Sequence, residues 1–526
     1  MWHTGFAFTD GVRHNVLSKK QLYANKDICE HEEIDLAEQR TQDADVIVIG
    51  GGNAGFAAVH AASERGRKVI LLEAAPEELS GGNSFFTAGA TRITHDGLED
   101  LQSFIVDDER HSVTEVPPYT TEDYLADLEK VTEGQTDPDL AAVLVEEARP
   151  TVEWLSSLGL KYRLMYERQA YENPDGSYLF WGGLHIGNVG GGEGLIEDHT
   201  RVAEEHGADI RYGHRVRRLI VEDDKVVGVV AEHDDEEVEL YAESIIMTAG
   251  GFESDPELRA KYLGDRWKHA KVRGTKFNRG DLIEAALEIG AARGGDFTTC
   301  HSIQWDAEHP VNESNIELTN RLSRQGYPLG ILVNKNGERF LDEGEDFRNL
   351  TYAKFGGVVL QQPEARAYQI FDAELRPNLS KADYEMPGVS EYKADTIEEL
   401  AAQLDLDQEA FLETVKDYNA NINEDATYDP NVLDGRYSEV TPRKSNWAKA
   451  LDTAPFYAYP VTCGITFTFG GVKTDTHGRV LNEDGEHIDG LYAAGEMLGG
   501  LFSNNYPGGS GLAAGMVFGR RAGSLA

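Results

Sequence analysis

The sequence predicts an α/β protein whose parallel sheet is assembled from two distant pieces of one chain. Two glycine-rich segments lie near opposite ends, at residues 50–55 (GGGNAG) and 504–511 (NNYPGGSG). The first follows the apolar, β-branched run of residues 46–49, which is typical of a buried parallel strand. Residues 244–251 and 490–496 both show the pattern of a buried strand that ends in small residues. We therefore expect one sheet to draw its strands from both ends of the chain.

The first strand and turn predict a dinucleotide site. A helix is expected over residues 56–65, directly after the glycines. Gly50 permits a tight turn, Gly52 lets the backbone approach a pyrophosphate, and Gly55 allows the helix to pack closely on the strand. The next predicted strand, residues 68–72, ends in Glu73, about twenty residues beyond the turn, where a carboxylate can accept both ribose hydroxyl hydrogens. A lone glycine pattern is weak evidence, but here the strand, helix and acidic residue are all in register.

Two further segments complete the predicted nucleotide-binding domain. Residues 79–84 (LSGGNS) are glycine-rich enough to let the backbone approach a cofactor ring. Residues 211–218, 219–221 and 226–230 predict a strand followed by a hairpin. The result is a Rossmann-like domain made of two distant pieces of chain.

Composition limits the partners. The chain has 526 residues, enough for two or three domains, and its net charge of -43 comes from 92 acidic and 49 basic residues. Such a charge argues against nucleic acid or an anionic membrane as a partner. It indicates a solvated, self-repelling surface suited to high salt, where charges are screened, so we expect a halophilic source.

Cysteine usage and hydropathy favour a cytoplasmic protein. Cys29, Cys300 and Cys463 lie far apart and form no CxxC pattern, so no iron-sulfur cluster, c-type haem or other metal site is predicted. No apolar run is long enough to span a bilayer, and we expect no direct membrane insertion. Residues 1–43 are polar and are predicted to form an N-terminal extension.

Longer motifs carry a resemblance to a known family. Residues 248–252 (TAGGF), 278–281 (NRGD), 331–343 (ILVNKNGERFLDE) and 491–496 (LYAAGE) occur in the order found in the flavoprotein family of fumarate reductases and succinate dehydrogenases, which the chain resembles from about residue 44 to its end. Within that family it most resembles the tricarballylate dehydrogenase branch. Three motifs carry this finer resemblance, at residues 342–349 (DEGEDFRN), 464–471 (GITFTFGG) and 505–511 (NYPGGSG).

The resemblance implies an FAD-binding domain over residues 44–297 and 463–526, interrupted by an α+β capping domain over residues 298–462. The cap is expected to close over the flavin and exclude water. Residues 396–421 carry apolar side chains at helical spacing, and we predict that they form cap interior rather than a binding face: Ile397, Leu400, Leu404, Phe411, Val415 and Tyr418.

The resemblance also implies the FAD contacts. They carry over to Gly50, Gly52, Ala54, Gly55, Glu73, Gly81, Gly82, Asn83, Ser84, Ala88, Gly89, Val216, Ala249, Gly250, Asp281, Glu496, Ser510, Gly511 and Leu512. For Asp281 and Glu496 plain surface charge stays an alternative. In membrane-bound succinate dehydrogenases a histidine bonds covalently to the flavin, but the matching position here is Asn83, so non-covalent FAD is expected.

The implied chemistry is transfer of two hydrogens across a carbon-carbon bond next to a carboxylate, with hydride at flavin N5 and a proton at an arginine. The resemblance gives catalytic roles to Arg348, Glu343 and Tyr506. Arg348 is the expected proton acceptor, which requires burial to lower its pKa, and Glu343, Glu345 or Asp346 are possible relays. A simple salt bridge from Arg348 to Glu345 or Asp346 stays an alternative.

The substrate positions differ from those of the fumarate enzymes and indicate another polyacid, with oxidation of tricarballylate to cis-aconitate as the leading hypothesis. The expected ligands are Arg321, Arg324, Thr466, Thr468 and Tyr506. A fumarate reductase-like enoate reductase, a ketosteroid-type dehydrogenase and a non-catalytic flavin-binding subunit stay open. The family further implies a separate, membrane-associated electron-accepting protein as a partner.

Overall fold

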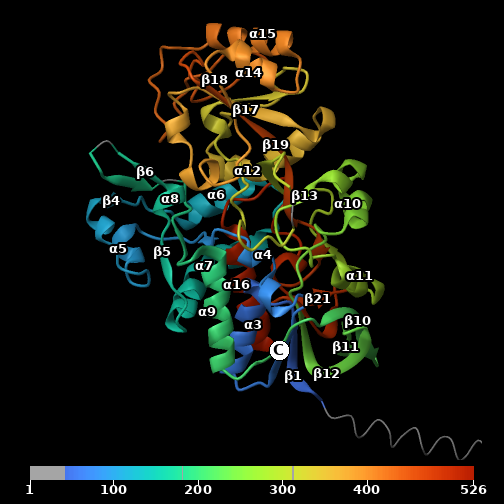
Figure 1. Ribbon diagram of the computed structural model, residues 1–526. Helices are drawn as coiled ribbons and strands as arrows, with labels where there is room; N and C mark the ends of the chain where they lie inside the picture. The colour runs from blue at the N-terminus through green and yellow to red at the C-terminus, as the bar shows by residue number, and fades with distance from the viewer. Residues whose placement is uncertain (1–41, 174, 181, 311–312) are drawn as a thin grey trace, which may run out of the picture. The chain divides into compact units, whose positions relative to one another are not determined.

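The computed structural model describes residues 42–526, except for residues 174, 181 and 311–312 (Figure 1). Nearly all of the predicted extension over residues 1–43 lies outside the described residues. Residues 44–526 form one compact unit, to which the following description applies. Among the described residues, no helix combines the length and the apolar character needed to cross a membrane.

The first sheet confirms that both ends of the chain build one α/β domain. Its centre is β1 (Ala44–Ile49), which pairs in parallel with β2 (Val69–Leu72) on one side and β12 (Glu236–Met247) on the other. On the far side of β12 lies β22 (His487–Ala493), with Ile245 beside Leu491. The remaining members are β9 (Asp209–Arg211), β10 (Arg215–Glu222), β11 (Lys225–His233) and β21 (Arg479–Leu481), and the strand order is β10-β11-β22-β12-β1-β2-β9, with β21 on β22.

Helices α3 (Asn53–Glu64) and α16 (Ser510–Leu525) lie side by side (Figure 1). α3 begins three residues earlier than the predicted residue 56, because the chain turns into the helix directly after Gly52. The two backbones pack closely at glycines of α16. A Cβ atom on Gly519 would come within 2.2 Å of the Ala54 carbonyl oxygen, and one on Gly523 within 2.2 Å of the Ala58 oxygen. The close packing brings the two glycine-rich segments of the sequence together at the start of both helices.

A second sheet carries the predicted cap. Its longest strand, β19 (Phe456–Thr468), pairs with β15 (Cys300–Asp306), β17 (Ala367–Phe371), β18 (Tyr392–Ala394) and the short β13 (Lys271–Val272), while β16 (Ile331–Asn334) lies beside β17. The strand β19 is continuous through residues 462 and 463, where the domain boundary was predicted. The cap and the first domain are therefore joined through one uninterrupted strand.

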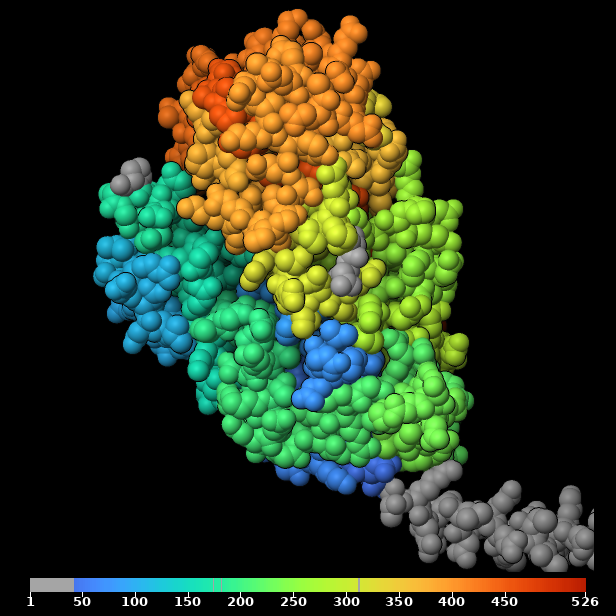
Figure 2. All heavy atoms as spheres, in the orientation of Figure 1, coloured from blue at the N-terminus to red at the C-terminus, as the bar shows by residue number. Residues whose placement is uncertain are grey.

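Two helices of the cap cover this sheet. They are α14 (Ile397–Gln403), which Thr396 caps, and α15 (Gln408–Ala420), which Asp407 caps. Leu400, Leu404, Phe411, Val415 and Tyr418 are buried against strands of the second sheet, and Ile397 packs on the same cluster. The prediction that these side chains form protein interior is confirmed. Figure 2 shows the residues of this region, in orange, covering one end of the described unit.

The other elements are short or flank the first sheet, except that α12 (Arg348–Leu360) packs on β15 and β19 of the second sheet. The helices are α4 (Gly82–Phe85), α5 (Leu98–Leu101), α6 (Thr121–Val131), α7 (Pro138–Ser157), α8 (Tyr166–Gln169), α9 (Gly191–Glu205), α10 (Pro256–Leu263), α11 (Asp281–Glu288), α12 (Arg348–Leu360) and α13 (Lys381–Tyr384). The strands are β3 (Ala90–Thr91), β4 (Thr114–Glu115), β5 (Tyr162–Leu164), β6 (Ala170–Glu172), β7 (Tyr178–Phe180), β8 (Ile186–Asn188), β14 (Arg293–Gly294) and β20 (Gly471–Val472).

Candidate active site

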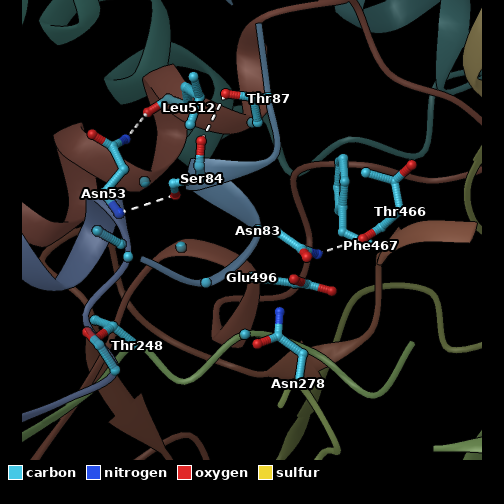
Figure 3. Close-up of a pocket in the computed structure, with 18 of the residues that line it drawn as sticks. Asn53, Asn83, Ser84, Thr87, Thr248, Asn278, Thr466, Phe467, Glu496 and Leu512 are labelled. Carbon is cyan, nitrogen blue, oxygen red and sulfur yellow. Dashed lines mark hydrogen bonds between the residues drawn. The ribbon is translucent and has the colours of Figure 1, made fainter. Parts of the chain in front are cut away.

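A cavity is lined by segments from the whole length of the described chain. The first glycine turn, the end of β2, helix α4, the end of β19 and the start of α16 all contribute to its wall (Figure 3). Cap residues from α12 complete it. The cavity therefore lies where the two sheets and the two glycine-rich segments meet.

The glycine turn has the shape that a bound phosphate group requires. Gly50 has a φ of +108°, and a Cβ on it would lie 2.5 Å from the Thr248 carbonyl oxygen. A Cβ on Gly55 would lie 1.9 Å from the Gly50 oxygen, which explains the close approach of α3 to β1. Gly52 lines the cavity just before α3 begins, so backbone N–H groups and the helix N-terminus face the open space. These features fit a pyrophosphate.

Glu73 lies at the end of β2, with 5% of its surface exposed, and lines the cavity. Its two oxygens accept hydrogen bonds from the backbone N–H groups of Gly51 and Ala75, each at 2.7 Å. Burial raises the pKa of Glu73 even though these two donors oppose the shift. Val216 and Asp281 line the same part of the cavity wall, and Asp281 forms ion pairs with Arg215 and Arg217. This end fits an adenosine ribose and its base.

Asn83 connects three segments at the opposite part of the cavity. Its side-chain amide donates to Oε1 of Glu253 at 2.7 Å and to the carbonyl oxygen of Thr466, and its oxygen accepts from the backbone N–H of Thr275 at 2.9 Å. Figure 3 shows the Asn83 amide directed at β19. Asn83 is thus held in place by three hydrogen bonds.

Two carboxyl groups, Glu253 and Glu496, contact each other beside Asn83. Glu496 lines the cavity and accepts a hydrogen bond from the Thr468 backbone N–H at 2.6 Å, whereas Glu253 is fully buried. Oε1 of Glu253 accepts from the amides of Asn83 and Asn278, both at 2.7 Å. Burial raises the pKa of both carboxyl groups, and each disfavours a second negative charge on its neighbour. The pair therefore retains a proton where a single carboxyl group would lose it.

Three arginines line one end of the cavity: Arg168 on α8, Arg273 just after β13, and Arg348 at the first turn of α12. Among residues 42–526 as described, no carboxylate lies within ion-pair distance of Arg273 or Arg348. Nη1 of Arg273 donates to the Thr466 hydroxyl at 3.2 Å, and Nη2 of Arg348 donates to the Arg168 carbonyl oxygen at 2.7 Å. Burial lowers the pKa of both Arg273 and Arg348 below the usual value for arginine.

Two tyrosines meet at the same end. The hydroxyl groups of Tyr352 and Tyr506 lie 2.5 Å apart, and both side chains line the cavity beside Phe467 and Phe502. Burial raises the pKa of both tyrosines, so the pair is neutral. The ring of His301 packs edge-on against Tyr506, with centroids 4.9 Å apart. An aromatic wall thus faces the arginines.

Most of the residues predicted from the sequence line this cavity. Those that do are Gly50, Gly52, Ala54, Glu73, Gly82, Asn83, Ser84, Ala88, Val216, Ala249, Gly250, Asp281, Arg348, Thr466, Thr468, Glu496, Tyr506, Gly511 and Leu512. Gly55, Gly81, Gly89 and Ser510 lie behind it. A Cβ on Gly89 would come within 2.8 Å of the Gly191 backbone, and the Ser510 hydroxyl is bonded to the Tyr124 hydroxyl at 2.8 Å. These four positions support the wall without facing the space.

Three predicted residues lie elsewhere. Arg324 and its partner Asp306 are completely buried in a 2.6 Å ion pair, so this guanidinium has no face toward the cavity. Arg321 has an exposed side chain outside the cavity. Glu343 is buried, bonded to the guanidinium of Arg339 and to the backbone N–H of Leu332 at 2.8 Å. Arg324 and Glu343 therefore stabilise this part of the fold. The structure corrects the predicted substrate contact of Arg324, and it shows that Glu343, predicted as a catalytic proton relay, is paired with Arg339.

Four residues at or beside the cavity were not predicted from the sequence: Arg168, Arg273, Glu253 and Tyr352. Glu253 directly follows the TAGGF motif, and Tyr352 lies one helical turn after Arg348, so both carried a local signal. Arg168 and Arg273 lie outside the motifs, and only the tertiary fold brings them to Arg348.

Comparison with known proteins places the chain in a family. The sequence model of a family described as an FAD binding domain matches residues 45–512. A probable fumarate reductase of Shewanella frigidimarina is 30% identical over 498 residues, covering 93% of this chain and 76% of the relative. An NADH:acrylate oxidoreductase of Vibrio harveyi is 27% identical over 92% of this chain, which spans about half (50%) of that relative's length.

A shorter match and a solved structure extend the comparison. A 3-oxosteroid 1-dehydrogenase of Mycolicibacterium smegmatis is 29% identical over 64% of this chain and 63% of its own length. The open conformation of a flavocytochrome c3 fumarate reductase superimposes with a TM-score of 0.68 at 28% identity, covering 94% of this chain and 80% of that one. With the glycine turn, Glu73 and the cavity that joins both ends of the chain, these matches show that the chain belongs to the family of FAD-binding oxidoreductases that includes the fumarate reductases.

Proposed function

We propose that this FAD-dependent oxidoreductase transfers two hydrogens across a carbon-carbon bond next to a carboxylate of a small polycarboxylic acid. The observation that carries the proposal is the cluster of Arg168, Arg273 and Arg348 at one end of the cavity. Arginine suits planar, bidentate recognition of carboxylates, and Arg273 and Arg348, which have no acidic partner among the described residues, favour an anionic ligand. The relative named for fumarate supports a substrate with two carboxylates, and the relative named for acrylate supports a carbon-carbon bond next to a carboxylate.

Some residues of the chain would bind FAD, and others would bind the substrate or exchange a proton with it. Bound FAD supplies the acceptor or donor of a hydride. The glycine turn and Glu73 would hold its pyrophosphate and ribose, Glu496 would accept its hydroxyl hydrogens, and the first turn of α16 would present backbone N–H groups to the ring. The side-chain amide of Asn83 lacks the nucleophilic ring nitrogen of a histidine, which supports the predicted non-covalent attachment.

Arg348 is the proposed site of proton transfer. Its guanidinium lies in the cavity wall at the N-terminus of α12, where the helix dipole adds to burial in disfavouring a positive charge. In dehydrogenation an Nη atom of Arg348 would take the proton from the carbon next to the one that loses hydride. In reduction the same atom would donate it. The carbonyl oxygen of Arg168 accepts a hydrogen bond from Arg348, and the guanidinium of Arg168 is paired with Asp383 at 3.3 Å. Arg168 is therefore a charged neighbour of the proposed proton-transfer group.

Arg273, Thr466 and Tyr506 would orient the carboxylates. Arg273 already donates to the Thr466 hydroxyl, which fixes the guanidinium beside β19. The guanidinium of Arg168 already has the Asp383 carboxylate as a partner, so those of Arg273 and Arg348 are the two that can pair with substrate carboxylates. Tricarballylate stays our first candidate, tested beside fumarate and succinate. The separate electron-transfer protein implied by the family resemblance is part of this proposal.

A second candidate is a 3-oxosteroid. The Tyr352 and Tyr506 pair offers a directional hydroxyl to a ketone oxygen, and Phe467 and Phe502 provide an apolar wall. The 3-oxosteroid 1-dehydrogenase among the relatives favours it as well. A neutral steroid would leave the arginine cluster without a counter-charge, which is why we rank it second.

The test is an anaerobic titration of the FAD-loaded protein, followed by flavin absorbance. Tricarballylate, succinate and a 3-oxosteroid are added to the oxidised protein, and fumarate and cis-aconitate to the chemically reduced one. We expect a polycarboxylate to change the redox state of the flavin, and Arg273→Gln to require about 10- to 100-fold more of it, because each lost charge-assisted hydrogen bond is worth about 1.5–3 kcal/mol. Arg321→Gln, with an exposed side chain outside the cavity, is the matched control. A response to the steroid alone would favour the second candidate, and no response to any compound would favour a non-catalytic flavin-binding subunit.

A further inference from the structure

A series of buried hydrogen bonds lies behind the first turns of α3 and α16. It involves residues to which the proposed reaction assigns no role. It starts at His60 on α3, continues to His199 on α9, and reaches Asn53, the first residue of α3. Nε2 of His60 lies 3.0 Å from Nδ1 of His199, and Nε2 of His199 lies 3.0 Å from Oδ1 of Asn53. Both histidines are completely buried.

Asn53 is the residue of this hydrogen-bond series that lines the cavity. It lines the cavity wall, and its Nδ2 donates to the carbonyl oxygen of Leu512 at 2.8 Å (Figure 3). Its backbone N–H donates to the hydroxyl of Ser84 at 3.0 Å. One side chain therefore links the first turn of α3 to the first turn of α16, the two helix N-termini that face the cofactor.

The direction of every hydrogen bond follows from the chemistry of the end group. The Leu512 carbonyl oxygen can only accept, so the amide nitrogen of Asn53 faces it and the amide oxygen faces His199. His199 must then donate from Nε2, which leaves its Nδ1 without a hydrogen and able to accept from His60. Burial lowers the pKa of both rings, that of His60 to about 3, and keeps both histidines neutral. Each ring is thus held in the tautomer with hydrogen on Nε2.

Packing fixes the two rings in place. The His199 ring stacks on Phe56 with an interplanar angle of 8°, and on His60 with centroids 5.2 Å apart. The edge of Trp154 on α7 closes the other side of His60. His60 lies seven residues after Asn53, two turns along the same face of α3. The position of the Asn53 amide is therefore determined from three helices.

Burying these polar side chains costs more folding free energy than an apolar contact would. Nδ1 of His60 is buried and has no hydrogen-bond partner among the described residues. An apolar pair of similar size would fill the interface between α3 and α9 without leaving a polar atom unsatisfied. A series of buried polar side chains that ends beside the predicted FAD site is accounted for if it orients the side-chain amide of Asn53.

We propose that His199, itself oriented by His60, is a positioning residue that fixes the amide of Asn53 and thereby holds the N-terminal turns of α3 and α16 together around FAD. The proposal depends on FAD binding and is independent of the substrate.

The test compares variants by their rate of FAD release from the loaded full-length chain, followed by the rise of flavin fluorescence. We expect His199→Phe to speed release about tenfold, because the Asn53 oxygen loses its buried donor. The side-chain amide of Gln reaches the place of Nε2, whereas that of Asn reaches the place of Nδ1. His199→Gln should therefore restore release to within about twofold of the original rate, and His199→Asn should behave like His199→Phe. Equal effects of the Gln and Asn variants would overturn the proposal.

Two further measurements separate positioning from general damage. In an Asn53→Ala background, His199→Phe should add nothing to the release rate, since it acts through Asn53, and full additivity would contradict this. Nitrogen NMR of the histidine-labelled holoprotein should show both rings with hydrogen on Nε2, assigned with the single variants. A hydrogen on Nδ1 of either ring would refute the proposal even if a variant fails to fold.

Discussion

Two buried arginines of the cap, Arg324 and Arg339, differ from two arginines at the cavity wall, Arg273 and Arg348, in the source of their counter-charge. In the cap, Arg324 is paired with Asp306, and Arg339 with Glu343, and all four side chains are buried. At the cavity wall, Arg273 and Arg348 contact hydroxyl and carbonyl oxygens and have no carboxylate at ion-pair distance within the described part of the chain. The same residue type is structural where the fold supplies the anion, and available to a ligand where it does not.

At the cavity wall, the lack of a neighbouring carboxylate affects the pKa of an arginine. Burial lowers the pKa of Arg348, and its position at the start of α12 adds the unfavourable helix dipole. In the cap the opposite holds for Arg339, whose pKa is raised by Glu343 in spite of burial. A bound polycarboxylate would give the cavity arginines the counter-charge that Arg324 and Arg339 already have.

The largest effect is expected at Arg348. The substitution Arg348→Lys keeps the charge but moves the proton-carrying atom, and general acid-base groups contribute about 10²- to 10⁴-fold to a rate. We expect kcat to fall by that factor while FAD content and the unfolding temperature stay unchanged. Stopped-flow flavin absorbance measures the chemical step directly. An unchanged rate would show that Arg348 does not transfer the proton and is a structural cation, as Arg324 is.

The next effect is expected in the cap. Arg324→Met leaves the Asp306 carboxylate buried without its partner, which should cost about 3–5 kcal/mol in the free energy of unfolding measured with urea. Burial alone would raise the pKa of Asp306, and the Arg324 guanidinium and backbone donors hold it below its ordinary value. Adding Asp306→Asn should recover part of the loss.

The control for Arg324 is Arg321→Met, which should change stability by less than about 0.5 kcal/mol because this side chain is exposed. The folded fraction of Arg324→Met should keep its kcat/KM. A selective loss of substrate binding in a fully stable Arg324→Met variant would restore the role that the sequence predicted for Arg324.

The sequence was sufficient where a function is encoded in one stretch of chain. The run from β1 through Gly50 and Gly55 to Glu73 is contiguous, and each residue type has a local reason, so strand, turn, helix and carboxylate were all predicted. The C-terminal strand β22 could be assigned to the same sheet because its pattern repeats that of β12. Even the start of α3 was missed by only three residues, since Gly52 can serve as its cap.

The substrate end could not be predicted in the same way. Arg168, Arg273 and Arg348 come from α8, the segment after β13, and α12, and tertiary packing alone brings them together. Arg324 lies in a stretch that looked suitable for an anion, but its role was decided by Asp306, eighteen residues away and across a strand pairing. Sequence shows which residues are cations; the fold decides which of them meet an anion inside the protein.

Lys444 sharpens the comparison, because it is a buried cation that has no carboxylate partner among the residues that the structure describes and yet lies outside the cavity. Its Nζ donates to the carbonyl oxygens of Pro328 at 2.6 Å and Gly330 at 2.5 Å. Burial lowers the pKa of Lys444 from 10.5 to about 8. Lacking an ion pair is therefore insufficient to mark a functional cation, and facing the cavity is the second requirement.

This reading of Lys444 predicts a pH dependence of stability. Below pH 8 the amine is charged in both the folded and the unfolded chain, whereas between pH 8 and 10.5 the folded protein has released the proton that the unfolded chain still binds. The unfolding free energy therefore contains a term that rises with pH across this window, by up to roughly 3 kcal/mol. Other groups titrate there too, so the measured quantity is the difference between the original protein and Lys444→Met in urea unfolding at each pH. Lys416→Met, at an exposed lysine of α15, should show no such difference. A difference that is flat with pH would mean that Lys444 stays fully charged in the folded cap, and that backbone carbonyl oxygens alone can replace the carboxylates that Arg324 and Arg339 use.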